Sequence, residues 1–341
     1  MATSDTPCTM RTIAERLGVS VMTVSRALRN APGVHPETHR RVLAMAGKLN
    51  YQPDPSLTAL NAYRHGRRPR QVREQIAFVT NFPTATQWKR SATFVRYFEG
   101  ASRRAEQLGY KLEPFWLGAP GMNPRRASQI LRERGIRGVI VGPLAKGRTT
   151  LELEWDWFSS VAVGRSLASP GLTTVSINHF QVVELAWREA QARGFRRIGL
   201  ALTEHEDART TGALRGSCLL QHALAGGGAV VPLLYVSDFS ARAVTDWVSD
   251  HRPDVLLSSE QRHYDLLDDS VRRTLPFIHL NVNPALEVAG IDQGHDRVGA
   301  QAAALLHLKL LQRETGVPER RDMMVIDGSW QAGPLLGIAR E

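Results

Sequence analysis

Cysteine is scarce in this sequence, which holds only Cys8 and Cys218 among 341 residues. Two cysteines so far apart give no disulfide framework and no metal-binding pair, which is typical of a protein that works in a reducing compartment. The eleven histidines are scattered and lack the paired spacing of a zinc site. We therefore expect no metal site and no cofactor.

Long apolar runs are missing as well. No segment reaches the roughly 18 consecutive apolar residues of a membrane-spanning helix. Asp5 and Pro7 interrupt the continuous apolar core that a signal peptide would need. We therefore expect a cytoplasmic protein with no membrane partner. The glycine motifs of dinucleotide sites, P-loops and nucleophile elbows are also missing, so the sequence does not indicate an enzyme.

Positive charge is concentrated near the N-terminus. Residues 1–70 hold eleven Lys and Arg against four Asp and Glu, a net charge of +7 out of +10 for the whole chain. A basic segment joined to a nearly neutral remainder is typical of a protein that binds phosphates. A need for solubility would explain a high net charge, but it would not explain this concentration.

Residues 9–30 have the pattern of two short helices around a glycine turn. The first helix has apolar residues at helical spacing: Met10, Ile13, Ala14 and Leu17. Gly18 suits the turn and Ser20 the N-cap of the second helix. That helix has one apolar side, formed by Val24, Ala27 and Leu28. Its other side is polar and cationic, with Met22, Ser25, Arg26 and Arg29. A helix-turn-helix needs this division, because its second helix must meet base edges and phosphates; the alternative is an ordinary surface hairpin.

The head continues to residue 63 in this interpretation. Pro36 favours the start of a third helix, and residues 56–62 are expected to form a short hinge helix. A basic linker, 64–74, follows.

Farther along the chain there is one dense cluster of ionisable residues: Glu204, His205, Glu206 and Asp207. We interpret this cluster as a solvated loop.

Residues 75–341 alternate between short apolar strands and helices, which favours parallel sheets of βαβ units. A segment of this length suits two lobes better than one. We expect one lobe from about 75–177 and 294–324, and the other from 178–293 and 325–341. The predicted fold is therefore an all-α DNA-binding head of three helices plus a hinge helix, joined to an α/β two-lobed body of doubly wound parallel sheets.

The head pattern resembles the LacI/GalR family of bacterial transcription regulators. The resemblance rests on Thr-x-x-x-Ile-Ala-x-x-x-Gly-Val-Ser-x-x-Thr-Val-Ser-Arg-x-Leu, from Thr9 to Leu28, and on Asn50-Tyr51-x-Pro53. It extends more weakly into the body, through Phe98-Glu99-Gly100 and through Arg193-Gly194-Phe195-Arg196-Arg197-Ile198-Gly199. This family places a periplasmic-binding-protein-like body behind its DNA-binding head, so the resemblance implies the same for this chain.

The resemblance also implies roles within the head. Arg26 matches the family arginine of the recognition helix, which fits a bidentate contact to guanine. Val21 and Met22 stand at the two specificity-varying positions, where apolar side chains offer van der Waals contact only. Phosphate contacts are implied for four polar side chains: Ser20, Thr23, Ser25 and Tyr51. Arg29 stands where the family usually has asparagine. Leu60 matches the leucine that wedges into the minor groove at the operator centre.

For the body, the resemblance implies an effector site between the lobes. Eight residues match or replace the family's ligand positions: Arg165, Asn178, His179, Arg209, Ser259, Glu260, Asp292 and Gln293. The set departs from the family pattern, since Gly164-Arg165 stands for Asp-Arg and Ser259-Glu260 for Asn-Asp. Several groups that accept sugar hydroxyls are therefore missing. We expect a small-molecule effector other than a common hexose, such as a sugar-derived acid, or else a site that no longer binds a ligand.

The function that the sequence favours is a dimeric repressor that binds a palindromic double-stranded DNA operator at the bacterial nucleoid and responds to a sugar or sugar-derived acid. A solute-binding protein of transport or sensing would share the two-lobed body. That alternative predicts a signal peptide and no basic helical head, and the sequence favours neither feature.

Overall fold

A computed structural model describes residues 10–28, 34–49, 74–225 and 230–335. The chain divides into two compact units, Met1–Val72 and Arg73–Glu341, and each unit is described here by itself. The expected hinge helix, most of the basic linker, and the candidate residues Arg29, Tyr51 and Leu60 lie outside the described residues.

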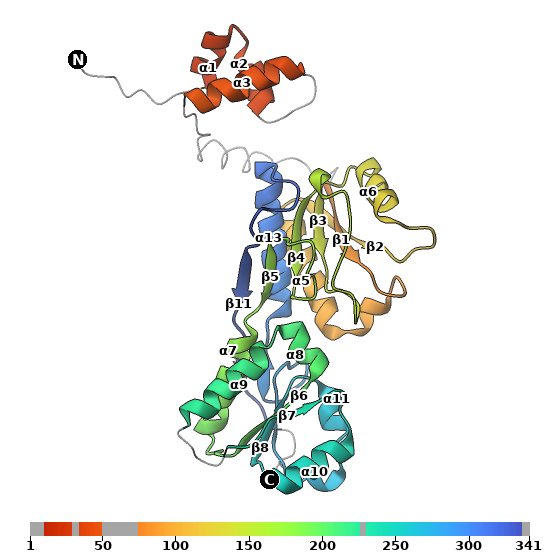
Figure 1. Cartoon of the computed structure of the whole chain (residues 1–341), viewed down its shortest axis with the longest axis vertical. Coiled ribbons are helices and arrows are strands. Elements are labelled where there is room, and N and C mark those ends of the chain that lie inside the picture. The colour runs from red at the N-terminus through yellow and green to blue at the C-terminus, as the bar shows by residue number, and fades with distance from the viewer. Residues whose placement is uncertain (1–9, 29–33, 50–73, 226–229, 336–341) are drawn as a thin grey trace, which may run out of the picture. The chain divides into compact units, whose positions relative to one another are not determined.

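The described part of the head contains three helices, drawn in red in Figure 1: α1 (Met10–Leu17), α2 (Val21–Leu28) and α3 (Pro36–Lys48). Their shared core is made of fully or nearly fully buried apolar side chains: Ile13, Ala14, Val24, Ala27, Val42 and Ala46. Both predicted helix starts are as expected. Ser20 Oγ accepts a hydrogen bond from the Thr23 amide at 3.0 Å, and Pro36 occupies the first turn of α3.

The body is an α/β unit of two six-stranded sheets. Its first sheet has the order β11-β5-β4-β3-β1-β2, with strands β1 (Glu74–Thr80), β2 (Tyr110–Trp116), β3 (Gly138–Val141), β4 (Ser159–Val163), β5 (Thr174–Ile177) and β11 (Met323–Ile326). All of its described strand pairs are parallel. This sheet and the helices α5 (Ala92–Gln107), α6 (Pro124–Glu133) and α13 (His295–Gln312) form the N-lobe.

The second sheet has the order β12-β10-β9-β8-β6-β7. Its strands are β6 (Ile198–Thr203), β7 (Leu234–Val236), β8 (Val255–Ser258), β9 (Phe277–His279), β10 (Gly290–Asp292) and β12 (Ser329–Gln331). Only β12 is antiparallel to its neighbour among the described pairs. The C-lobe helices are α7 (His179–Ala192), α8 (Glu204–Thr210), α9 (Ala213–Leu224), α10 (Ala241–His251), α11 (Gln261–Asp265) and α12 (Asp269–Arg272).

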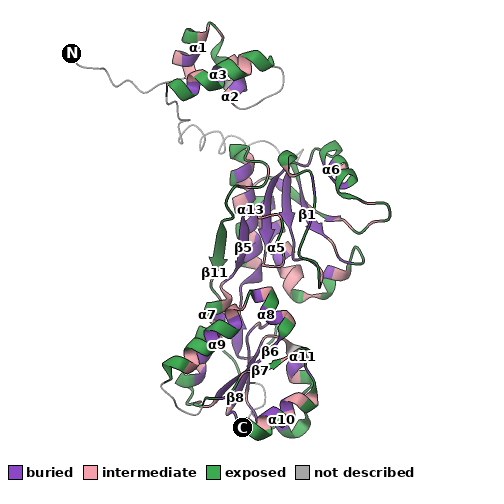
Figure 2. Cartoon of the chain, in the orientation of Figure 1, coloured by how far each residue is buried: buried purple, intermediate pink, exposed green. Residues whose placement is uncertain are grey.

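Helices cover both faces of each sheet because alternate strand residues point to opposite faces. In β1, Ile76 and Phe78 join a core with residues of α5 and α13, while Ala77 and Val79 join another with residues of α6. The same division separates α7 and α9 from α10 across β6. Figure 2 shows the result as buried strands between helices that expose one side. This is the doubly wound arrangement predicted from the sequence.

The chain passes between the lobes three times, as Figure 1 allows the reader to follow. The first passage joins β5 to α7 and the second joins β10 to α13. The third joins β11 to β12, between Ile326 and Ser329. This third passage begins slightly later than the predicted lobe boundary between residues 324 and 325, because the residues through Ile326 pair with β5 of the N-lobe. These passages put Asn178, Asp292 and Asp327 at the junction of the lobes.

The expectation of a solvated loop at residues 204–207 is wrong. These residues begin α8, and a capping box fixes its start: Thr203 Oγ1 accepts from the Glu206 amide, and the Glu206 carboxylate accepts from the Thr203 amide. Glu206 and Asp207 are only 7% and 4% exposed. Among the described helices, none is long and apolar enough to cross a membrane.

Candidate DNA-binding face and ligand site

The second helix of the head has one buried and one exposed side. Val24 and Ala27 are completely buried against the other two helices. On the opposite side, Met22 is 65% exposed, Val21 is 42% exposed, and Arg26 is exposed. The hydrophobic core thus fixes the orientation of α2 and leaves its opposite side exposed at the surface of the head.

The turn before α2 is tight and hydrogen-bonded. Gly18 has φ +65°, a left-handed conformation that glycine adopts without strain. The Val19 amide then donates to the Ala14 carbonyl at 3.1 Å, and Arg41 of α3 donates to the Leu17 carbonyl at 3.4 Å. This geometry is that of a helix-turn-helix, in which the second helix enters the major groove of duplex DNA.

Five of the candidate DNA-binding residues lie along the start and exposed side of α2: Ser20, Val21, Met22, Thr23 and Arg26. The hydroxyls of Ser20 and Thr23 lie 2.8 Å apart. Because Ser20 Oγ already caps the helix, a contact of this residue with phosphate would share the capping hydroxyl. The structure does not describe the side chain of Ser25, so its position stays a prediction.

In the body, the candidate residue His179 lies within electrostatic reach of two other candidates, Arg165 and Arg209. Burial, followed by the nearby charges of Arg165 and Arg209, lowers the pKa of His179 to about 4. Arg165 follows β4 and Arg209 lies on α8, so the two arginines come from different lobes. His179 is therefore neutral near pH 7.

Arg209 reaches the N-lobe. Its guanidinium carbon lies 5.7 Å from the centre of the Phe94 ring on α5. Burial lowers the pKa of Arg209, while the nearby Tyr97 and Glu260 raise it. Glu260 is one of the predicted ligand residues, so the structure brings together a fourth member of the set.

Asp292 is held by an arginine that sequence reasoning missed. Arg96 of α5 contacts the Asp292 carboxylate at 2.9 Å and the Asp296 carboxylate at 3.0 Å. Burial alone would raise the pKa of Asp292, but hydrogen bonds from Arg96 and from the Gly294 amide lower it below its ordinary value. Arg96 lies two residues before Phe98-Glu99-Gly100, the segment that carries part of the family resemblance. That position does not by itself indicate an ion pair with Asp292.

The remaining candidates are already engaged in hydrogen bonds within the chain. Asn178 donates from its side chain to the Asp327 carboxylate at 2.8 Å and accepts from the Gln181 amide. Gln293 is 6% exposed and donates to the Leu280 carbonyl at 2.8 Å. Ser259 donates to the Glu206 carboxylate. These three residues support the lobe junction and the strand ends around the arginines.

His295 is a further group that the sequence did not point to. It is 2% exposed, and its ring lies edge-on to Tyr97 at 4.9 Å between centres. Burial lowers its pKa to about 3, with a further contribution from the charge of Arg96. His295 Nδ1 is buried without a hydrogen-bond partner in the part of the chain that the structure describes.

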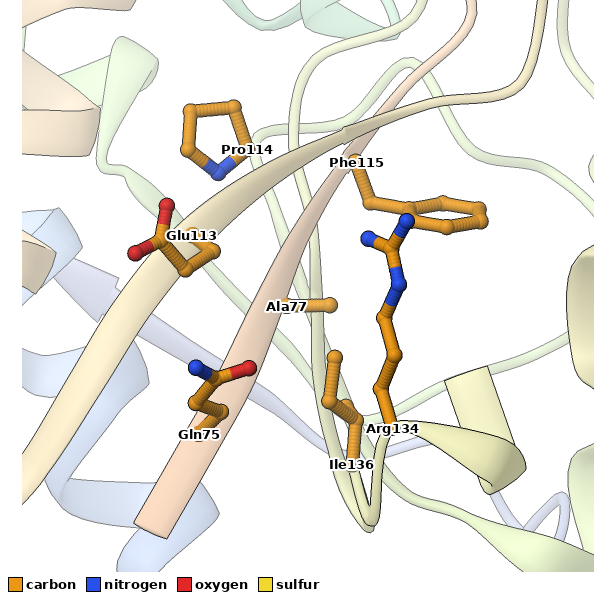
Figure 3. Close-up of a pocket in the computed structure, with 7 residues that line it drawn as sticks. All are labelled: Gln75, Ala77, Glu113, Pro114, Phe115, Arg134 and Ile136. Carbon is orange, nitrogen blue, oxygen red and sulfur yellow. The ribbon is translucent and has the colours of Figure 1, made fainter. Parts of the chain in front are cut away.

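A separate surface pocket of about 290 Å³ lies beside Gln75 and Ala77 of β1, Glu113–Phe115 of β2 and the segment between α6 and β3. Figure 3 shows the Arg134 side chain beside the Phe115 ring in this pocket, with the guanidinium 5.9 Å from the ring centre. None of the predicted ligand residues lines it. Within the described ranges, no group of three or more His, Cys, Asp or Glu is placed to hold a metal ion.

The geometry defines a class of protein: a helix-turn-helix head followed by a two-lobed α/β body. Residues 9–54 match the family model of bacterial regulatory proteins of the lacI family, so this segment is a helix-turn-helix domain of that family. Over 60 residues the chain is 45% identical to the sucrose operon repressors of Shigella flexneri and Escherichia coli. That match covers 18% of this chain and 18% of each relative.

Solved structures resemble the whole chain in fold. The lac repressor dimer bound to operator and the anti-inducer ONPF has a TM-score of 0.53 at 16% identity, and the match covers 98% of this chain and 100% of that one. A complex of the transcriptional regulator CelR with cellobiose has a TM-score of 0.52 at 18% identity, covering 95% and 98%. The predicted fold class and the family resemblance of the head are therefore confirmed.

Proposed function

We propose that this protein is a sequence-specific DNA-binding transcription regulator. It acts as a dimeric repressor on a palindromic operator, and a small polar ligand held between the lobes modulates its affinity for DNA. The observation that carries the proposal is the exposed, cationic side of α2 in a helix-turn-helix domain of the lacI family. As a DNA-binding regulator it would act in the cytoplasm, at the nucleoid.

Charge and relatives support the DNA-binding part. The net charge of +7 within residues 1–70 suits a phosphate backbone. The relatives matched by the head are named as operon repressors, and one structure of similar fold holds operator DNA. Leu60, Tyr51 and Arg29 remain predicted DNA contacts on the family resemblance alone. A solute-binding function would leave the helix-turn-helix without a role.

The body supports the ligand-modulated part. His179 lies within electrostatic reach of Arg165 and Arg209, and Arg209 lies within reach of Glu260. Three chain passages form the junction beside them. One structure of similar fold holds cellobiose and another holds ONPF. A ligand that binds one arrangement of the lobes more tightly would shift the population of DNA-competent dimers.

The test is operator selection followed by binding measurements at a series of salt concentrations. Full-length protein selects a duplex from a random pool, and fluorescence anisotropy then gives its affinity. Neutralising six to ten phosphates should give a slope of log affinity on log salt of about −5 to −9. A slope near zero, or selection of no duplex, contradicts the proposal.

Two arginine variants separate base reading from phosphate binding. Arg26→Ala should cost about 1–3 kcal/mol on the selected operator and relax the preference at one guanine. Arg67→Ala, in the basic linker, should weaken binding to all duplexes alike and reduce the salt slope by about 1. Equal losses on operator and on unrelated DNA for both variants would show that α2 does not read bases.

A further inference from the structure

One edge of the N-lobe sheet is apolar and exposed. Strand β11 ends the strand order on one side, as Figure 1 shows, and in the part of the chain that the structure describes its only strand partner is β5. Three consecutive apolar residues of β11 are exposed: Met323 by 38%, Met324 by 42% and Val325 by 48% (Figure 2). An exposed apolar strand at the edge of a sheet is a template on which another strand can pair.

The backbone of β11 turns hydrogen-bonding groups toward this open side. The carbonyls of Asp322 and Ile326 accept hydrogen bonds at 2.9 Å from amides on the β5 side, so the even-numbered residues of the strand face β5. Because this orientation alternates along a strand, the amides and carbonyls of Met323 and Val325 point away from β5. No described strand lies on that side to pair with them.

The other edge strands of the body lack this combination. At the opposite edge of the same sheet, β2 contains Lys111, Glu113 and Pro114, and charged residues and proline are the means by which proteins block pairing at an edge. The edge strands of the C-lobe sheet, β7 and β12, are three residues long, and each has one exposed residue. Among the described edge strands, β11 therefore has the surface best suited to pairing.

The residues on either side of β11 make this edge complementary to itself. Arg321 precedes the strand and Asp327 follows it, and both are exposed. In an antiparallel pair of two β11 strands centred on Met324, Arg321 of each copy lies opposite Asp327 of the other. In the same pair, Met323 lies opposite Val325. Opposite charges and apolar side chains directly across from one another both stabilise a strand pair.

Neighbouring registers lose this match. A pair centred on Val325 would put Met323 opposite the charge of Asp327. A pair centred on Met323 would put Glu319 opposite Asp327, and like charges in that position are destabilising. A pair centred between two residues would set outward-facing backbone groups against residues that already face β5. Charge and backbone direction thus select the register centred on Met324.

We propose that β11 pairs with β11 of a second copy of this chain, antiparallel and centred on Met324, and so joins two N-lobe sheets into one continuous sheet. Met323 of each copy exchanges both of its backbone hydrogen bonds with Val325 of the other. A second copy is favoured over an unrelated segment because twofold symmetry satisfies the charges at both ends of the strand at once. This contact is additional to the DNA and ligand sites and does not depend on either.

The two charged residues can form the new pair without losing their present contacts. Arg321 donates to the Thr174 hydroxyl at 3.0 Å, and a guanidinium has four further N–H groups. Asp327 accepts from the Asn178 side chain at 2.8 Å, and a carboxylate has a second oxygen. Both side chains therefore retain groups that can bind one another across the strand pair.

The experiment exchanges the charges between copies and measures association of the full-length protein by sedimentation velocity at a series of concentrations. Arg321→Asp and Asp327→Arg each set like charges opposite one another at both ends of the strand pair. Each variant alone should associate through β11 at least about tenfold more weakly than wild type, and the mass of its largest species should fall by half. An equimolar mixture of the two variants restores opposite charges at both ends, so it should associate as wild type does.

Two further variants test specificity and the backbone contact. Arg320→Asp is the matched control, because it makes the same change of charge one residue away, opposite Gly328 in the proposed register, and it should associate as wild type does. Val325→Pro removes an amide that points away from β5, which an edge strand tolerates, and it should abolish the association through β11. Thermal unfolding of each variant shows whether it is folded.

Loss of association in both charge variants and its recovery in their mixture supports the proposal. The proposal is overturned if wild-type protein stays monomeric at every concentration, if both charge variants associate as wild type does, or if their mixture stays as weak as each alone. Operator binding is measured on the same samples. If operator is bound while the β11 variants leave association unchanged, the strand pairing fails alone; if the mixture recovers association but no duplex is bound, the regulator function fails instead.

Discussion

At the scale of single residues, charge pairing at the lobe junction decides which groups are free to bind. Arg96 pairs with Asp292 and Asp296 together, so the carboxylate of Asp292, a predicted ligand residue, has a partner within the chain. The pKa of Arg96 is raised because hydrogen bonds to these two carboxylates outweigh its burial.

This pairing makes a prediction about acid stability. The folded-state pKa of Asp292 is depressed, so its contribution to stability is complete above the unfolded-state pKa of about 3.9 and is lost as pH falls through the folded-state pKa. Asp292→Asn should therefore lower the free energy of unfolding by about 1 kcal/mol at pH 7, a value discounted for solvent screening. Below about pH 4 the difference from wild type should shrink. Urea denaturation at several pH values measures it.

The control for this prediction is Asp246→Asn. Asp246 forms an exposed pair with Arg242 at 3.6 Å, and such pairs contribute little. The control should match wild type at every pH. A difference between Asp292→Asn and wild type that is as large at pH 3 as at pH 7 would mean that ionisation of Asp292 does not stabilise the fold.

Sequence reasoning found the residue types of the site but not their pairing. Arg165, His179, Arg209 and Glu260 were identified by their resemblance to family positions. In the structure His179 is within electrostatic reach of both arginines, and Arg209 of Glu260. Arg96 and His295 were missed because their roles depend on a contact between α5 and the second lobe passage, almost two hundred residues away in the sequence. No local pattern encodes a contact of that separation.

At the scale of elements, the body depends on two helices that approach unusually closely. A Cβ added at Gly299 of α13 would lie 2.0 Å from the Tyr97 carbonyl oxygen of α5, and one at Gly100 of α5 would lie 1.9 Å from the Asp296 carbonyl oxygen. Backbone meets backbone at this crossing, so no flexible side chain can move aside. The pair of helices holds Arg96 and Tyr97 beside the second lobe passage.

Gly299→Ala should therefore destabilise the protein strongly. Overpacking a tight contact typically costs about 1–3 kcal/mol, and a clash with a rigid backbone belongs at or above the upper end of that range. Gly216→Ala in α9 is the matched control, because nothing lies within 4 Å of the added Cβ. That change should instead stabilise by about 0.5–1 kcal/mol through helix propensity. Thermal unfolding of the two variants checks both signs, and a neutral Gly299→Ala would mean that the helices can separate without cost.

Most elements were predictable because their local signals agree with their packing. The apolar runs of β3 and β8 and the helical periodicity of α5 and α13 predict the alternation of strand and helix. The wrong prediction at α8 shows a local signal that was outweighed by composition. Thr203 and Glu206 have the spacing of a capping box, yet the density of charge in residues 204–207 suggested a solvated loop. Tertiary contacts bury Asp207 against Tyr235 and Arg215, and composition alone does not reveal them.

At the scale of the whole molecule, the proposed function couples two sites that share no residue. The coupling needs the ligand to bind one lobe arrangement more tightly than another, since a ligand with equal affinity for both shifts nothing. Arg165 and Arg209 come from different lobes, which is the placement that such a preference requires. The three chain passages would carry the change in lobe arrangement between the two sheets.

Thermodynamic linkage then makes a quantitative prediction. If a ligand held between the lobes changes operator affinity by some factor, saturating operator must change the affinity for that ligand by the same factor. Couplings of this kind are typically about fivefold to 150-fold. Anisotropy with labelled operator, at zero and saturating ligand, gives one factor, and calorimetry with ligand, at zero and saturating operator, gives the other.

The control variant is Arg26→Ala. It should weaken operator binding yet leave the ligand affinity of the free protein unchanged, because that residue lies in the head. Unequal factors in wild-type protein would mean that ligand and operator act on different populations, for example on different oligomers, and the single two-state coupling would be wrong.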